Sequence, residues 1–423
     1  MSQADKKGTI LVVSHVVPYP PAAGNEIRIL KMLDWLKAEG FSIILLLNHS
    51  ALPAERHQEL ERLFHRVHYI GNDYGDNLRP LPKRRLGATL RDALSVFLGH
   101  SAAMHRLVFG QDREKKVKSD GVKKYLAADR LMQITEYLCR EYKPCAVLGE
   151  YIFTAPCMDV VPDGILKIID THDMFSRKKE QVLAYGIDDP LPCSTREERN
   201  YLLKTDLVIA IQSNEARLFR NLVMERDVIT VGIDFETIEN KDNGAVVPGK
   251  ILVVGSDNPL NQHGLRQFHD HAWPAIRSRV PGATLRVVGK LANHLQTDDE
   301  RVELAGWVED LDLEYRRAAV VVNPTVAGTG LKIKSVEALC KGKALVATAN
   351  SVEGIEYSGT APYVVCTDWP SFAEATVRLL ISAEERKLLQ SLALEYAREN
   401  FSTEKIYAPL RQKLRPLLHE SES

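Results

Sequence analysis

Two series of short apolar runs alternate with helix-like segments along the chain, and a polar, turn-rich stretch separates them. The first series opens on TILVVS (9–14), passes through an amphipathic stretch, EIRILKMLDWLKAEG (26–40), and continues with FSIILLLN (41–48). Near-continuous apolar strands of this length are typical of a parallel sheet that helices cover on both faces. We therefore predict a βαβ unit, followed by strands at VHYI (67–70), AVLG (146–149), LKIID (166–170), LVIAI (207–211) and VIT (228–230).

The second series begins after ENKDNGAVVPG (239–249), which has the composition of a linker. Two helices are expected, at 265–279 and 331–342. Strands are expected at KILVVG (250–255), ATLRVVG (283–289), RVELAG (301–306), AVVVNP (319–324), ALVAT (344–348) and APYVVC (361–366). The pattern predicts two doubly wound α/β domains. We place them at 1–238 and 250–400, with a C-terminal helix at 401–423 that reaches back to the first domain.

One basic segment, 79–130, interrupts the βα pattern. It carries thirteen lysines and arginines against five acidic residues, with apolar residues between them. Two interpretations stay open. The segment is either a solvated helical insertion or a patch that contacts anionic lipid or an anionic acceptor. Nucleic acid is not expected as a partner, because no series of stacking aromatic residues and no known binding motif is present.

Composition narrows the class of protein. The chain has 423 residues, of which 45% are hydrophobic and 26% charged, and a net charge of -1 that gives no overall attraction to nucleic acid. The six cysteines lie far apart, without zinc spacing, so we expect neither a disulfide framework nor a metal site. The sequence contains no run of about 18 apolar residues, so we do not expect a helix that spans a membrane. We expect a cytoplasmic protein, with 79–130 as a candidate for peripheral contact at the inner face of a membrane.

Two loops have the residues of an anion site. The first, PYPPAAGN (18–25), is stiffened by prolines, contains Gly24 and Asn25, and opens directly into a helix whose free N–H groups favour a phosphate. The second contains Gly328, Thr329 and Gly330 and also opens into a helix. The first loop could also be a plain connection, since no GxGxxG fingerprint is present.

Charged residues flank the second loop. Lys332 and Lys334 stand where they could balance a diphosphate, and Glu337 follows within two helical turns, where it could accept hydrogen bonds from ribose hydroxyls. The alternative for each is an ordinary charge on a solvated helix face.

The segment GTGLKIKSVEALCKGKALVAT (328–348) resembles the donor-binding motif of retaining family-4 glycosyltransferases with the GT-B fold. The resemblance spans nearly the whole chain and is strongest over 250–357. Further segments in that family's order are PYPPAAGNEIRIL (18–30), NPLNQHGLRQF (258–268), LRVVGK (285–290) and VELAGWVEDL (302–311). The resemblance implies two Rossmann-like domains facing a cleft, with C-terminal helices crossing back. The donor nucleotide would lie against the second domain and the acceptor against the first.

The resemblance also assigns roles by position. Glu337 would bind ribose, while the backbone N–H groups of Gly330 and Leu331 would bind the diphosphate. His172 would contact the transferred sugar. We take His172, Lys332, Lys334 and Glu337 as candidate catalytic residues. Gly24, Asn25, Asn261, Lys290, Val308 and Thr329 are further donor-binding candidates, and Arg28, Glu150 and Asp173 are acceptor-binding candidates.

The chain departs from the family pattern at two places. Thr329 stands where the family commonly has a second glutamate, eight residues before Glu337. SDNPLN (256–261) stands where the family has an arginine and a lysine. We expect Lys332 and Lys334 to supply the missing charge, with Lys290 or Arg28 as supplements.

The expected activity is transfer of a sugar from a nucleoside-diphosphate sugar, UDP or GDP being the expected nucleotide, to a hydroxyl of a glycan, lipid-linked or protein acceptor. The configuration would be retained, and no cofactor or metal would take part. Three alternatives stay open: a catalytically silent nucleotide- or glycan-binding homologue, a GT-B-like nucleotide-sugar epimerase, and a peripheral membrane protein that acts through 79–130. A glycogen-type phosphorylase is disfavoured by the chain length and by the lack of a pyridoxal-binding lysine motif.

Overall fold

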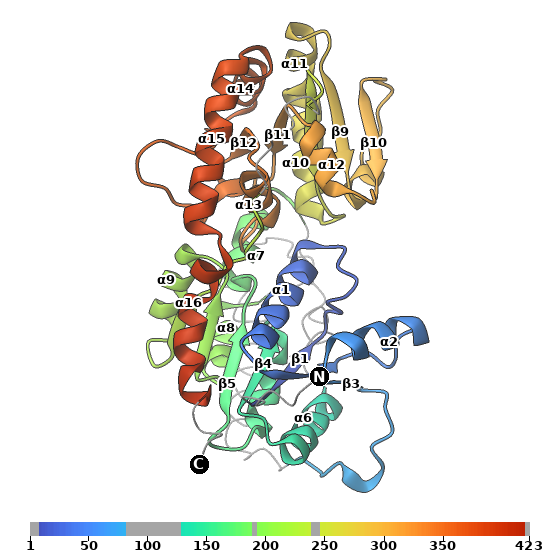
Figure 1. Cartoon of the computed structure of the whole chain (residues 1–423), viewed down its shortest axis with the longest axis vertical. Helices are drawn as coiled ribbons and strands as arrows, with labels where there is room; N and C mark the ends of the chain where they lie inside the picture. The colour runs from blue at the N-terminus through green and yellow to red at the C-terminus, as the bar shows by residue number, and fades with distance from the viewer. Residues whose placement is uncertain (1–7, 82–127, 188–192, 238–245, 419–423) are drawn as a thin grey trace, which may run out of the picture.

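The protein consists of two α/β domains stacked along the long axis of the molecule (Figure 1). The computed structural model describes residues 8–81, 128–187, 193–237 and 246–418. Nearly all of the basic segment 79–130 lies outside these residues, so its predicted role stays a prediction. Each domain is built on one parallel sheet, and the predicted doubly wound α/β GT-B fold is confirmed.

The N-terminal domain contains seven parallel strands within the described residues, in the order β3-β2-β1-β4-β5-β6-β7. The strands are β1 (Thr9–Ser14), β2 (Ser42–Leu47), β3 (Arg66–Tyr69), β4 (Ala146–Glu150), β5 (Leu166–Asp170), β6 (Leu207–Ala210) and β7 (Asp227–Thr230). Alternate residues of each strand enter two apolar cores, one on each face of the sheet. Leu11 and Val13 belong to one core, and Ile10 and Val12 belong to the other.

Helices cover both faces of this sheet. They are α1 (Gly24–Ala38), α2 (Ala54–Leu63), η1 (Gly75–Asn77), α6 (Asp129–Tyr142), η2 (Ile152–Val160), α7 (Phe175–Ala184), α8 (Thr195–Leu202) and α9 (Ser213–Leu222). The start of α1 is fixed locally, because the Glu26 carboxylate accepts hydrogen bonds from the backbone N–H groups of Ala22 and Ala23.

The C-terminal domain contains six parallel strands within the described residues, in the order β10-β9-β8-β11-β12-β13. They are β8 (Lys250–Val254), β9 (Thr284–Val288), β10 (Val302–Gly306), β11 (Val320–Asn323), β12 (Leu345–Thr348) and β13 (Val364–Cys366). The helical elements are α10 (Pro259–His271), α11 (Trp273–Arg279), η3 (Lys290–His294), α12 (Leu311–Arg317), α13 (Ile333–Cys340), η4 (Asn350–Val352), α14 (Trp369–Ile381) and α15 (Ala383–Asn400).

The last helix, α16 (Thr403–Leu414), returns to the N-terminal domain, with η5 (Arg415–Leu418) after it (Figure 1). The ring of Tyr407 stacks on Trp35 of α1 at 4.6 Å, and its hydroxyl donates to Asp234. Arg411 donates two hydrogen bonds to Glu39, at 2.8 and 3.0 Å. The chain therefore joins the two domains twice, once between β7 and β8 and once between α15 and α16.

The predicted strands fall within a residue or two of those observed, but two predictions were wrong in detail. The helix expected at 265–279 is two helices, because Pro274 has no N–H to continue α10 and lies in the first turn of α11. Its true start is Pro259, which Asn258 caps by accepting from the N–H of Leu260. The strand expected at 361–366 is shorter. Across the described residues, no helix has the length and apolar character that crossing a membrane requires.

Candidate functional site

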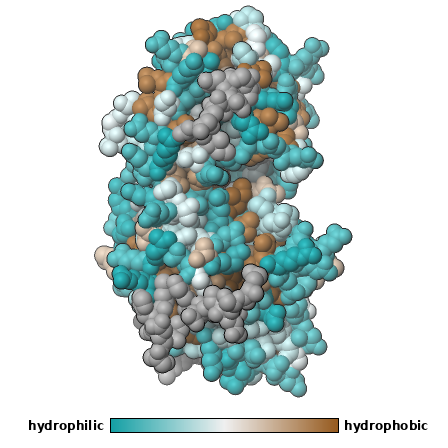
Figure 2. Space-filling view, viewed as in Figure 1, coloured by the Kyte–Doolittle hydropathy of each residue, from teal (hydrophilic) through white to brown (hydrophobic). Residues whose placement is uncertain are grey.

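The two predicted loops meet between the domains, at the carboxyl ends of both parallel sheets, where ligands of open α/β sheets bind. Gly24, the first residue of α1, lies against Ile333, the first residue of α13. A Cβ atom on Gly24 would stand 3.1 Å from Cδ1 of Ile333, so a larger residue would press the two domains apart. The waist between the domains is hollowed in the space-filling view (Figure 2).

Lys334 lies at the start of α13 with neutral partners. Its ammonium donates to Oδ1 of Asn261 at 2.7 Å and to Oγ1 of Thr325 at 2.9 Å. In the described ranges no carboxylate forms an ion pair with it. Burial and the nearby Lys332 lower the pKa of Lys334 to about 7. The sequence predicted both Lys334 and Asn261 for the donor site, and the structure brings them together. An anion bound here would supply the missing counter-charge.

Lys332 is placed differently from Lys334. Its ammonium folds back on its own loop and donates to the carbonyl oxygens of Gly328 at 3.0 Å and Thr329 at 3.2 Å. Burial lowers the pKa of Lys332, although the carboxylates of Asp173, Glu353 and Glu215 attract its charge. The two lysines that the sequence grouped together therefore have separate surroundings, and only Lys334 lacks nearby carboxylates.

Glu337 lies on the buried side of α13. The Tyr315 hydroxyl of α12 donates to its Oε2 at 3.1 Å. Burial raises the pKa of Glu337 to about 7, against the lowering effects of Tyr315 and Lys341. Val308, another donor-binding candidate, is partly buried against an apolar cluster that includes Tyr315.

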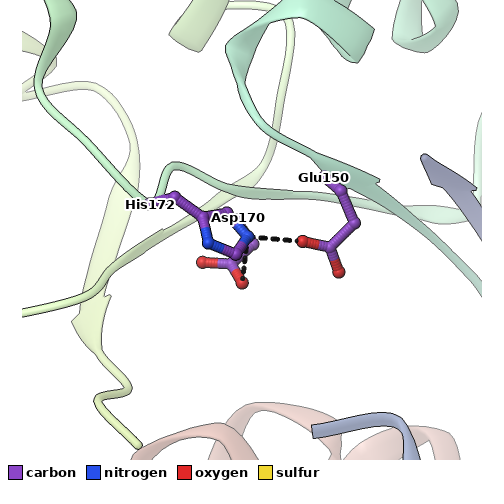
Figure 3. A group of neighbouring side chains, drawn as sticks. All are labelled: Glu150, Asp170 and His172. Carbon is purple, nitrogen blue, oxygen red and sulfur yellow. Dashed lines mark hydrogen bonds and ion pairs between the residues drawn. The ribbon is translucent and has the colours of Figure 1, made fainter. Parts of the chain in front are cut away.

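His172 is held in a buried network at the ends of β4 and β5 (Figure 3). Its Nε2 lies 2.7 Å from Oε2 of Glu150 and 3.3 Å from Oδ2 of Asp170. Its ring stacks on Tyr151 at 4.2 Å between centroids, with the planes 8° apart. Burial and the Asp170 charge raise the pKa of Glu150. These contacts fix the orientation of the imidazole.

Backbone conformation supports this placement of His172. Tyr151 and His172 both have positive φ, 64° and 59°, which is costly for residues with a side chain. Tyr151 directly follows the end of β4, and His172 lies two residues after the end of β5. The two unusual conformations bring the rings face to face at the carboxyl edge of the sheet.

Arg28 is an internal anchor of the N-terminal domain. It is 1% exposed, and its guanidinium forms a bidentate pair with Asp170 and donates to the carbonyl oxygens of Val231 and Gly232. Its donors are therefore directed at the protein. Arg28 therefore links α1 to β5. It is not part of the acceptor site that we propose, nor of the charges that we propose for the diphosphate.

Glu150, Asp170 and His172 are of types that ligate metals, and their ligand atoms lie within 4.8 Å of one another. The Arg28 guanidinium already brings a positive charge to Asp170. A divalent cation would have to displace or repel that guanidinium, so the residues present fit an internal ion-pair network better than a metal centre.

The Gly328-Thr329-Gly330 loop is bound to the N-terminal domain. The N–H of Gly328 donates to Gln181, and the Thr329 hydroxyl donates to Oδ1 of Asp173 at 3.0 Å. A Cβ atom on Gly330 would stand 2.7 Å from the His172 carbonyl oxygen, and Gly330 has φ of 74°, so glycine is required there. Asp173, a predicted acceptor residue of the first domain, is thus hydrogen-bonded to the donor loop of the second domain.

Gly330 has two further partners that sequence reasoning missed. The carboxylate of Glu215 accepts its N–H at 2.7 Å, and the amide of Gln212 donates to its carbonyl oxygen at 3.0 Å. Gln212 immediately precedes α9, and Glu215 lies in the first turn of that helix. Their position after a predicted strand was a signal, but a polar residue at a helix start is usually a cap.

The remaining candidates occupy varied positions. Asn25 lies beside the Tyr151 hydroxyl. Lys290 is exposed at the start of η3. The Leu331 side chain is buried in an apolar cluster that includes Ile211 and Phe401 and so joins the two domains. The roles assigned to these residues stay predictions.

Comparisons with known proteins find similarity to glycosyltransferases, which in sequence is concentrated in the C-terminal domain. Residues 248–382 match the model described as Glycosyl transferases group 1. A Klebsiella pneumoniae protein described as an uncharacterized 44.6 kDa protein in the cps region is 22% identical over 172 residues, or 38% of this chain. The match spans less than half of that relative, 44% of its length.

Solved structures resemble the whole chain. Sucrose-phosphate synthase from Thermosynechococcus elongatus is 16% identical, with a TM-score of 0.61 over 98% of this chain and 100% of that one. HepE from Anabaena, in complex with UDP and glucose, is 13% identical, with a TM-score of 0.61 over 97% and 100%. The pneumococcal O-GlcNAc transferase GtfA, in complex with UDP and GlcNAc, is 11% identical, with a TM-score of 0.67 over 97% and 99%. These likenesses show the shared fold.

Proposed function

We propose that this protein is a glycosyltransferase that moves a sugar from a nucleoside-diphosphate sugar to a hydroxyl group of an acceptor. The observation that carries the proposal is the Lys334 ammonium, which lies at the start of α13 with only neutral hydrogen-bond partners. A partly buried ammonium of this kind, without a carboxylate partner, gains from a bound anion. The family match of residues 248–382 supports the same activity.

The diphosphate would bind at the start of α13. Lys334 would contact it directly, and Asn261 and Thr325 hold that ammonium in place. The free N–H groups of the first helical turn add a second attraction for an anion. Gly24, whose backbone lies close to Ile333 at the start of α13, would border the diphosphate from the N-terminal domain. Because HepE and GtfA were solved with UDP, we propose UDP before GDP as the nucleotide.

The nucleoside would lie along α13. The Glu337 carboxylate would accept hydrogen bonds from ribose hydroxyls, and the Tyr315 hydroxyl orients it from the other side. Val308 would border the base. Ribose binding requires the ionised carboxylate, because a protonated one loses acceptor capacity.

The chemical step would depend on charge. As the bond from sugar to diphosphate breaks, negative charge grows on the leaving group and positive charge grows on the anomeric carbon. Lys334 stabilises the leaving diphosphate more strongly as this charge develops, which lowers the barrier. An acceptor hydroxyl would attack from the face that the diphosphate leaves, and its proton would pass to a leaving phosphate oxygen. This route retains the anomeric configuration and needs no metal or cofactor.

The acceptor would approach from the N-terminal domain. The network of His172, Glu150 and Tyr151 fixes a rigid wall at the carboxyl ends of β4 and β5, beside the Gly330 loop. We propose that the transferred sugar rests against this wall, with His172 as the contact residue. A glycan, a lipid-linked sugar or a protein hydroxyl would each fit this scheme, and an anionic membrane contact through 79–130 stays part of the proposal.

The first test is nucleotide binding by the full chain. Thermal shift with UDP, GDP and their sugar derivatives should raise the melting temperature for at least one nucleotide. A donor that binds is then offered with candidate acceptors, and NMR of the product should show the anomeric configuration of the donor. If a nucleotide sugar binds but is neither transferred nor hydrolysed, the catalytically silent binding protein is favoured. A product with inverted anomeric configuration would overturn the proposed retention.

A further inference from the structure

The peptide group of Gly330 is held on both sides by the N-terminal domain. Oε1 of Glu215 accepts the Gly330 N–H at 2.7 Å, while Nε2 of Gln212 donates to the Gly330 carbonyl oxygen at 3.0 Å. Glu215 lies in the first turn of α9 and Gln212 immediately precedes that helix. The polar groups of one C-terminal-domain peptide are therefore bound across the domain interface.

Glu215 is in an unfavourable state for a carboxylate. It is fully buried, and its second oxygen, Oε2, has no hydrogen-bond partner within the described ranges. Burial and the charge of Asp173 raise the pKa of Glu215 to about 8, although the Gly330 N–H and Lys332 act in the other direction. Glu353 adds a further negative charge nearby. A buried, half-bonded carboxylate is costly, so this contact can be given up for a better one.

We propose that Glu215 is an internal competitor of the donor diphosphate for the Gly330 N–H, and that it thereby sets the affinity of the protein for its donor. This inference rests on the proposed function, with the diphosphate also reaching the Gly330 N–H as the family resemblance implies. One N–H cannot bond a carboxylate and a phosphate oxygen fully at once. Above its raised pKa of about 8, where Glu215 is ionised, its charge would also repel a diphosphate brought beside it. Donor binding must therefore free the Gly330 N–H from Glu215.

The surrounding contacts define how the exchange takes place. Lys332 caps the carbonyl oxygens of Gly328 and Thr329, so it would move together with the loop. Gln212 binds only the carbonyl oxygen of Gly330 and leaves the N–H as it is. Glu215 therefore competes with the diphosphate for the Gly330 N–H, whereas Glu215 and Gln212 together hold the loop in place. Variants of the two residues can separate competition from loop anchoring.

The experiment measures the dissociation constant of UDP, and of GDP if UDP does not bind, by calorimetry on the full chain. Glu215→Ala removes the competitor altogether, and Glu215→Gln keeps an oxygen that accepts the Gly330 N–H. Glu215→Ala should bind the nucleotide about tenfold more tightly, the effect of losing one competing hydrogen bond. Glu215→Gln should bind nearly as the wild type does at pH 7, because the raised pKa of about 8 leaves the carboxyl mostly protonated there. Glu225→Gln is the matched control, because it removes the same charge from an exposed position in the same domain. It should bind as the wild type does.

Gln212→Ala separates competition from a general loosening of the loop. It should leave the dissociation constant nearly unchanged, because the Gly330 N–H stays bound to Glu215. Equal tightening in Gln212→Ala and Glu215→Ala would overturn the inference. Unchanged or weaker binding in a folded Glu215→Ala variant would overturn it as well. A melting curve without nucleotide establishes that each variant is folded.

The outcomes also distinguish this inference from the proposed function. If the wild type binds a nucleoside diphosphate and the Glu215 variants bind no more tightly, only the competition is wrong. If neither the wild type nor the Glu215 variants bind UDP, GDP or their sugar derivatives, the proposed function is wrong, and the inference falls with it.

Discussion

The Lys334 ammonium lies 2.7 Å from the side-chain oxygen of Asn261, a neutral group at the start of α10. Asn261 belongs to the segment where the resembling family has an arginine and a lysine. The structure therefore brings a positive charge from α13 to a place where the sequence of α10 offers none. This relationship gives the donor site a partly buried lysine whose counter-charge would be the ligand.

Removing this cation should weaken nucleoside-diphosphate binding. Lys334→Ala should raise the dissociation constant of UDP by roughly 10- to 100-fold, the range for a hydrogen bond to a charged group. Calorimetry on the full chain measures it. Lys387→Ala, an exposed change on α15, is the control and should bind as the wild type does. Equal affinities for the wild type and Lys334→Ala would show that the diphosphate is bound elsewhere.

Donor binding should depend on the ionisation of Glu337. Its pKa is raised to about 7, so the carboxyl is protonated below that pH and loses acceptor capacity for ribose. The contribution of Glu337 to UDP affinity should therefore fall as the pH drops from 8 to 6, by at most about tenfold per pH unit. It is measured as the difference between the wild type and Glu337→Gln, because Lys334, whose pKa is lowered to about 7, gains charge over the same range. Glu337→Gln should bind UDP weakly and should not show this loss of affinity at low pH. If the variant still showed the loss, another group would be responsible for it.

Arg28 should matter for stability. Arg28→Ala would leave Asp170 buried without its guanidinium, and loss of one partner of a buried pair costs about 3–5 kcal/mol. Urea unfolding of the full chain measures the loss in the free energy of unfolding of the N-terminal domain. Arg199→Ala breaks a partly exposed pair with Glu225 and should cost less than about 1 kcal/mol. Similar losses in the two variants would contradict an anchoring role for Arg28.

The return of α16 should stabilise the N-terminal domain through Tyr407. Tyr407→Ala removes the ring stacked on Trp35 and should cost about 3–5 kcal/mol, as for other buried aromatic residues. Tyr407→Phe keeps the ring and loses only the hydrogen bond to Asp234, for about 1 kcal/mol. If Tyr407→Ala unfolded no more easily than Tyr407→Phe, the stacking would contribute little.

The strands could be predicted from the sequence because each is a short, almost purely apolar run in a sheet buried on both faces. Helix ends were harder. The cap formed by Asn258 and the break at Pro274 depend on one or two residues inside a longer amphipathic pattern. Local signals of this size are easily read as part of a single helix.

The candidate site was predictable where neighbours in sequence are neighbours in space. Lys334 and Glu337 lie on one helix, so their grouping followed from spacing. The partners of Gly330 did not, because Glu215 lies 115 residues away in the other domain. The different surroundings of Lys332 and Lys334 were also hidden, since they depend on which carboxylates the N-terminal domain brings to the loop.

Turnover of the donor tests the central claim most directly. The full chain is incubated with a panel of UDP- and GDP-sugars, and the released nucleoside diphosphate is measured for the wild type and for Lys334→Ala. We expect slow release from at least one donor by the wild type, and release at least about tenfold slower by the variant. No release from any donor, or equal release by both proteins, would contradict glycosyl transfer at this site.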